Sequence, residues 1–259
     1  MNRTLAELPV ELLYEIHLFA LAPSFPHTCK RIHLVFKNTP SSYRAQYLIA
    51  CIKDAHTRDY AIPTKLLRYP LCTKEVLEAF HRIAGNTGHT NWATELPRRF
   101  FRSLTPKVYK DGSPVWSERD YPLPFLRYLY ECPKLNPPPD ANSHDGYPLT
   151  KAVHAGFVPL IRFLLDHGAS PQFKNNLPVL VAIHRKDLAL VRLLIERTES
   201  DLPAGETKRK GKKRKLEDRV SVTPEMLKTA VKSGARDIVE YFTREKGCVP
   251  DMQTLLMLS

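Results

Sequence analysis

The chain has 259 residues, 43% of them apolar, and a formal net charge of +12. This length accommodates one large domain or two modest ones, and the apolar content excludes wholesale disorder. No apolar run approaches the roughly 20 residues of a membrane-spanning helix, and three glutamates near the N-terminus exclude a secretory signal, so we expect no membrane association.

The cysteines and the missing catalytic motifs exclude further classes. The five cysteines are odd in number, widely spaced and never arranged as C-x-x-C, which is typical of reduced intracellular thiols. The chain contains no phosphate-binding loop, nucleophile elbow, dinucleotide-binding glycine pattern or histidine pair at metal-ligand spacing. We therefore expect a protein that is not an enzyme and that needs no cofactor or metal.

The N-terminal residues predict three short helices. In the first, Pro9 suits the opening turn of a helix, because its missing N–H would be unpaired there anyway. Leu12, Ile16 and Phe19 follow at helical spacing, with Leu13 and Ala20 beside them and the glutamates facing outward. Two further helical runs cover 28–36 and 41–56.

These residues resemble the F-box, a helical module that docks proteins onto the Skp adaptor of cullin–RING ubiquitin ligases. The matching residues are Leu8-Pro9-Val10-Glu11-Leu12-Leu13-Tyr14-Glu15-Ile16, followed by Cys29-Lys30-Arg31. The link between these halves is shorter than in the family, and Ile32-His33 replaces an aromatic residue. The resemblance implies a helix-in-groove contact with the adaptor through Leu8, Pro9, Leu12, Leu13 and Ile16. The alternative is an amphipathic helical cap over the repeats that follow.

The second half of the chain repeats itself. Residues 147–154 match 177–184, and residues 159–166 match 189–196, at an offset of 30. A period of this length indicates a stacked helical solenoid, in which no unit buries its apolar face alone. Residues 124–131 align as part of an earlier, degenerate copy, and a third copy begins at Thr223-Pro224. Residues 107–120, which precede the degenerate copy, are rich in turn residues, and we expect them to form a loop.

The repeats resemble ankyrin repeats, and with the N-terminal motif they resemble fungal F-box proteins that carry such repeats. The family pattern is echoed by Asp145-Gly146-Tyr147-Pro148-Leu149, Ala152, Gly156, Leu164-Leu165 and Gly168-Ala169. Such stacks bind targets on their concave face, made by the turns and the first helix of each unit. The resemblance therefore implies a target-binding surface of Tyr147, Lys151, His154, Lys174, His184, Arg185, Lys228 and Lys232. This surface is basic, so we expect an acidic protein target.

A charged insertion separates the second and third copies, at about 201–220. Its core supplies seven positive charges, which leaves +5 for the rest of the chain. The run resembles a nuclear-import signal recognised by an import receptor, formed by Lys208, Arg209, Lys210, Lys212, Lys213, Arg214 and Lys215. The alternative is a solubilising or RNA-attracting segment.

Taken together, the residues and resemblances predict an all-α chain. We expect an F-box-like module at 1–56, a helical linker at 57–110 and degenerate ankyrin-like repeats at 111–259. The expected function is that of the substrate-recognition subunit of a Skp–cullin–F-box ubiquitin ligase, located in the nucleus and also in the cytoplasm. The alternative is an ankyrin-repeat scaffold or chaperone for a nuclear or ribosomal protein, without ligase activity. Direct nucleic-acid binding ranks last, because the charge lies in one run without interleaved aromatic residues.

Overall fold

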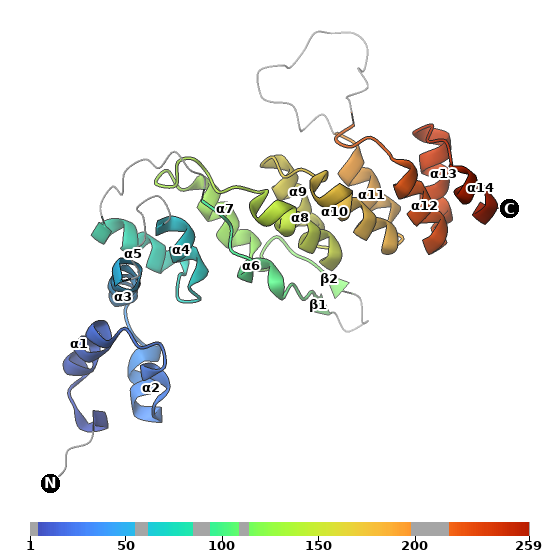
Figure 1. The fold of residues 1–259 in the computed structure, drawn as a ribbon. Helices are drawn as coiled ribbons and strands as arrows, with labels where there is room; N and C mark the ends of the chain where they lie inside the picture. The colour runs from blue at the N-terminus through green and yellow to red at the C-terminus, as the bar shows by residue number, and fades with distance from the viewer. Residues whose placement is uncertain (1–4, 55–61, 85–93, 109–113, 198–217, 259) are drawn as a thin grey trace. The chain divides into compact units, whose positions relative to one another are not determined.

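The structure is a computed structural model that describes residues 5–54, 62–84, 94–108, 114–197 and 218–258 (Figure 1). The described residues are mostly helical, as predicted. The exception lies where the sequence predicts a loop: β1 (Lys107–Val108) and β2 (Pro114–Val115) form a two-residue antiparallel ladder. No helix within the described ranges is long and apolar enough to cross a bilayer. The chain divides into two compact units, residues 1–97 with 125–139, and residues 98–124 with 140–259.

The first unit begins with three helices around an aromatic core. They are α1 (Val10–Ala20), α2 (Lys30–Lys37) and α3 (Ser41–Asp54), with short 3₁₀ turns η1 (Leu5–Glu7) and η2 (Phe25–His27). The buried cluster consists of Leu13, Phe25, Ile32, Phe36 and Tyr43. Because each of α2 and α3 contributes a residue to it, the three predicted N-terminal helices share one core.

The rest of the first unit is also helical, and part of it packs against α3. It contains α4 (Ile62–Arg68), α5 (Lys74–Ala84) and most of α7 (Leu123–Glu131). The Thr73 hydroxyl accepts a hydrogen bond from the Val76 N–H just before α5, as an N-cap residue does. Residues 125–131 align with the repeats in sequence, yet their contacts group them with this unit.

The second unit is a stack of helix pairs, preceded by α6 (Arg99–Arg102). The pairs are α8 (Ser143–Ala155) with α9 (Val158–Asp166), α10 (Phe173–His184) with α11 (Leu188–Ile195), and α12 (Pro224–Ser233) with α13 (Arg236–Glu240). The first helices of the pairs, α8, α10 and α12, pack on one another in sequence order. The π-helical turn η5 (Tyr241–Glu245) and α14 (Met252–Leu258) complete the unit (Figure 1).

The turns of this stack repeat at the offset seen in the sequence. Inside α8, residues 144–146 all have left-handed φ values, and inside α10 residues 174–176 do the same, so each helix has a kink near its N-terminal end. Between the helices of each pair lies one left-handed residue: Gly156, Lys186 and Gly234, with φ of 71°, 55° and 67°. The internal repetition predicted from the sequence is therefore a repetition of backbone geometry.

Candidate functional site

Two surfaces collect the residues that the sequence singles out, and the first is on α1. Leu13 and His17 form the buried side of this helix, with exposed fractions of 0% and 4%. Leu12 is 43% exposed and Phe19 is 88% exposed, while Ile16, between them along the helix, is half-buried. The stripe of Leu12, Ile16 and Phe19 is thus rotated away from the core by about 100°, one residue's rotation in a helix.

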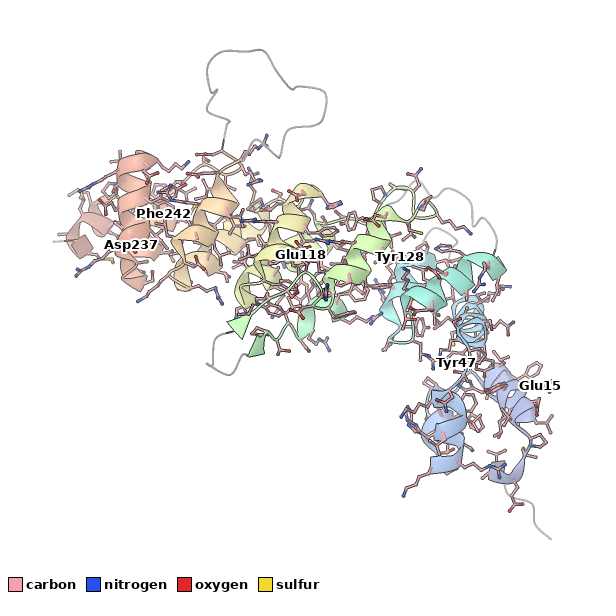
Figure 2. The ribbon with its side chains drawn as sticks, turned by 180° about the vertical axis from the view of Figure 1, so that it is seen from behind. Glu15, Tyr47, Glu118, Tyr128, Asp237 and Phe242 are labelled. Carbon is pink, nitrogen blue, oxygen red and sulfur yellow. The ribbon has the colours of Figure 1, made fainter. Side chains whose placement is uncertain are left out.

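The five expected adaptor contacts divide between this surface and the core. Pro9 and Leu12 are exposed, and Leu8 and Ile16 are half-buried against the core cluster. Leu13 is fully buried, so its expected contact with an adaptor does not fit this structure. Exposed Leu5 and Val10, and Leu34 of α2 at 58%, add further apolar area to the module. The exposed Glu15 projects from α1 into solvent (Figure 2).

His17 determines which side of α1 faces inward. Its ring stacks on Tyr47 of α3 with a centroid distance of 4.2 Å and an interplanar angle of 9°. Its Nδ1 lies 2.8 Å from the Tyr43 hydroxyl, which also donates to the carbonyl of Tyr14. Burial lowers the pKa of His17, so the ring is neutral in this environment. A histidine that satisfies its polar atom and stacks on aromatic rings replaces an apolar residue at this position.

The second surface lies on the stacked helices of the second unit. The expected target-binding residues are all exposed or half-buried there. His154, His184 and Lys232 are equivalent in the repeat and lie in the last turns of α8, α10 and α12, and all three are exposed. Lys232 is a cation in the last turn of α12, where the helix dipole favours positive charge.

Other members of the second surface are held by short-range contacts. Arg185 donates from Nη1 to the carbonyl of His154, at 2.7 Å, and so joins consecutive repeats. Lys228 donates to the side chain of Gln253, at 2.6 Å. The Lys174 ammonium lies 3.9 Å from the Asp145 carboxylate, and both side chains are exposed. This ion pair is therefore weak.

Two cationic side chains lie near the ring of Tyr147. The guanidinium of Arg98 lies 5.4 Å from its ring centroid, and the ammonium of Lys151 lies 5.9 Å from it. The sequence did not predict the contact between Arg98 and Tyr147, because Arg98 precedes α6 and lies far from the repeats in sequence. The sequence also missed Lys186, which occupies a turn position that holds glycine in the neighbouring copies.

The predicted import signal lies at 208–215, outside the described residues. Its proposed recognition stays a prediction from the sequence alone. The same applies to most of the insertion that surrounds it, since the structure resumes at residue 218.

Comparison with known proteins adds no identification. The chain matches no family model, no curated protein and no solved structure. The residues and geometry of the two surfaces are therefore the basis for inferring a function.

Proposed function

We propose that this chain is the substrate-recognition subunit of a Skp–cullin–F-box type ubiquitin ligase. The observation that carries the proposal is the exposed apolar stripe on α1. A small helical module normally turns such residues inward, and here Leu13 and His17 already fill that position. Leu12 and Phe19 are therefore available to a partner.

The chemistry of this stripe fits a helix-in-groove contact. Burial of one large apolar side chain contributes about 1.5–3 kcal/mol, and the aromatic Phe19 belongs to the residue class enriched at interface centres. The F-box motif places the adaptor-binding residues on the same helix. Leaving aside the buried Leu13, Phe19 extends the expected set of Leu8, Pro9, Leu12 and Ile16 by one further turn.

The stacked helices of the second unit would bind the target. Their exposed positive charges would speed the encounter with an acidic segment and set its orientation. Gly156 and Lys186 turn the chain between the helices of their pairs, which keeps the row of His154, His184 and Lys232 in register. The chain itself carries out no chemistry under this proposal; it joins a target to the ligase.

A pull-down with purified Skp adaptor tests the proposal. The intact chain should retain the adaptor, and Pro9→Asp or Leu8→Asp should abolish retention. Pro9 is the sharper variant, because it is exposed and Leu8 is half-buried. Failure of the intact chain to retain the adaptor would favour the scaffold alternative, in which the N-terminal helices only cap the repeats.

A further inference from the structure

A pocket of about 680 Å³ follows one side of α3 in the first unit. Its floor consists of residues at three- or four-residue spacing, which share one side of a helix: Tyr43, Tyr47, Cys51 and Asp54. Its walls come from η2 and α2 at one end and from residues 69–71, which follow α4, at the other. No residue of the α1 stripe lines it, so the pocket is separate from the proposed adaptor contact.

The walls of this pocket are largely aromatic. The aromatic residues that line it come from α2, α3 and the turn after α4: Phe36, Tyr43, Tyr47 and Tyr69. The Tyr43 hydroxyl is hydrogen bonded to Nδ1 of His17, at 2.8 Å. The Tyr47 hydroxyl donates to the Leu21 carbonyl, at 3.5 Å. Because these hydroxyls have partners within the protein, the tyrosines offer apolar ring surface to a ligand, and rings pair favourably with other rings.

The chain around the pocket is basic. Residues 16–53 contain no Asp or Glu but five Lys and Arg residues, and two of these, Lys37 and Arg44, line the pocket. Neither forms an ion pair with another residue of the described ranges. The end of the pocket next to α2 therefore presents positive charge that no neighbouring carboxylate neutralises.

The Arg44 side chain is held in place at this end. Its Nε donates to the Thr39 hydroxyl, at 2.9 Å, and its Nη2 donates to the Lys37 carbonyl, at 2.8 Å. These bonds fix the guanidinium beside the last residue of α2 and leave Nη1 without a hydrogen-bond partner among the described residues. A guanidinium fixed in this way donates to an anionic oxygen with little further loss of side-chain freedom.

Asp54, the acidic residue among the described lining residues, is distant from this end. It follows Arg44 by ten residues on α3, which corresponds to about 15 Å along the helix axis. That separation exceeds the screening length of about 8 Å at physiological ionic strength. Asp54 therefore does not cancel the positive charge beside α2.

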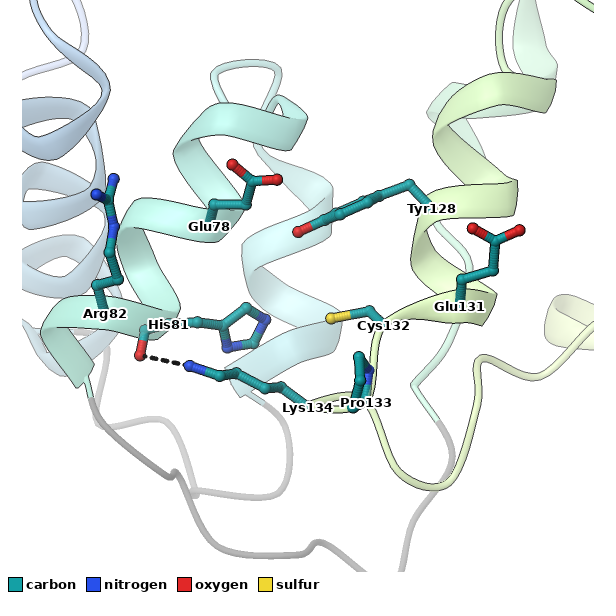
Figure 3. Close-up of a pocket in the computed structure, with 8 residues that line it drawn as sticks. All are labelled: Glu78, His81, Arg82, Tyr128, Glu131, Cys132, Pro133 and Lys134. Atoms are coloured by element: carbon teal, nitrogen blue, oxygen red, sulfur yellow. Dashed lines mark hydrogen bonds between the residues drawn. The ribbon is translucent and has the colours of Figure 1, made fainter.

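Another pocket of the first unit lacks this separation of charge. It lies between α5 and the C-terminal end of α7, and its wall contains Glu78 and Glu131 together with Arg82 and Lys134 (Figure 3). The Lys134 ammonium already donates to the His81 carbonyl, at 3.2 Å. Because both signs of charge line it, that pocket indicates no ligand charge, whereas the pocket along α3 indicates an anion.

We propose that the pocket along α3 binds a small aromatic acid, a compound with an aromatic body and one carboxylate group. The aromatic body contacts the tyrosine-lined floor, and the carboxylate accepts hydrogen bonds from Arg44 and Lys37. The volume of the pocket lies within the about 300–1,000 Å³ that is typical of small-molecule sites. The proposal does not depend on adaptor binding.

Calorimetric titration of the full chain at neutral pH tests this pocket. The probes are biphenyl compounds that carry one carboxylate, hydroxymethyl or aminomethyl group at the para position, so they share an aromatic body and differ in charge. The carboxylate should bind. The alcohol and the amine should bind at least about tenfold more weakly, because they lack the anionic acceptor.

Matched variants locate the charge contact. The double variant Lys37→Gln with Arg44→Gln should reduce the preference for the carboxylate over the alcohol to about twofold or less. The control is Lys30→Gln with Lys53→Gln, which removes two exposed cations from the same two helices outside the pocket and should keep the preference.

The single variant Lys37→Gln guards against a folding defect, since Arg44 also bonds to the end of α2. Lys37 is exposed, so this variant should fold, as circular dichroism monitors. It should reduce the preference for the carboxylate by about threefold or more.

Four results overturn the proposal. They are absence of binding by the carboxylate probe, equal affinity for the carboxylate and either other probe, an unchanged preference in the Lys37→Gln and double variants, and an equal loss of preference in the control. Each is distinguishable from failure of the adaptor proposal, which is measured with purified Skp adaptor and variants of the α1 region.

Discussion

The imidazole of His17 contacts four aromatic rings of the first unit, those of Phe25, Phe36, Tyr43 and Tyr47. Besides Tyr47, it contacts Phe36 with a centroid distance of 4.6 Å. Because burial lowers its pKa from the ordinary 6.5, the unfolded chain binds a proton at this residue more readily than the folded chain. The stability that the neutral ring contributes is therefore complete above pH 6.5 and is lost as the pH falls below it.

We expect the free energy of unfolding to decrease on acidification from about pH 7 to pH 5, and His17→Phe to reduce that slope. One histidine contributes at most about 1.4 kcal/mol per pH unit. Urea unfolding of both proteins at several pH values measures the difference. His81, whose pKa is also lowered, contributes equally to the pH slope of both proteins. Its contribution therefore cancels in the comparison. Equal slopes in the two proteins would contradict this role of His17.

Leu12 and Leu13 are neighbours in sequence with opposite environments, 43% and 0% exposed. We expect Leu13→Ala to cost about 2–5 kcal/mol of stability, because it leaves a cavity in the core. Leu12→Ala should cost less than about 1 kcal/mol. Chemical denaturation of the two variants makes the comparison. A similar loss in both would show that the exposed stripe is part of the core.

The sequence predicts the three helices of this module but not which side of α1 is buried. Leu12, Ile16 and Phe19 form a regular apolar stripe, and periodicity alone favours it as the inward face. The buried face instead contains His17, a residue that is more often exposed. Only the aromatic partners on α2 and α3, which are distant in sequence, make that position suitable for an imidazole.

At the scale of elements, the turns inside the helix pairs show a recurrent geometry. In each pair one left-handed residue, Gly156, Lys186 or Gly234, donates from its backbone N–H back to the first helix. Glycine adopts this conformation without steric cost, whereas a residue with a side chain is strained there. Lys186 is the copy that departs from glycine.

Lys186→Gly should therefore stabilise the protein by about 0.5–1 kcal/mol, an amount typical of relieving one left-handed residue. The control is Lys232→Gly, which introduces glycine into the last turns of α12 and should destabilise by up to about 1 kcal/mol. Thermal unfolding distinguishes the two. A destabilised Lys186→Gly would mean that contacts of the lysine side chain outweigh the backbone strain.

Local signals predicted the elements of the repeats well. Thr223 caps α12 by accepting from the Met226 N–H, as its position before Pro224 indicates. Gly156 and Gly234 are left-handed C-cap residues of α8 and α12, a position at which glycine is common. The left-handed run 174–176 could not be read from Lys174-Asn175-Asn176 alone; it becomes predictable only by analogy with the glycine-containing copy at 144–146. The ladder of β1 and β2 was not predicted either, because strands of two residues give no periodic signal in the sequence.

For the whole molecule, the proposed surfaces differ in chemistry. The α1 stripe is apolar, whereas the surface of the stacked helices is basic. Apolar area suits a constant partner whose groove is preformed, and distributed positive charge suits acidic segments that vary in sequence. This separation of roles is what a subunit that joins a target to a ligase requires. It also makes adaptor binding less sensitive to salt than target binding.

The most direct test of this account is calorimetric titration of the full chain with purified Skp adaptor. We predict a one-to-one complex whose affinity falls by at least about tenfold in Leu12→Asp and in Phe19→Asp. Both variants should unfold at the same denaturant concentration as the unmodified chain, because these side chains lie outside the core. The absence of a complex with the unmodified chain, or undiminished affinity in both variants, would contradict the account.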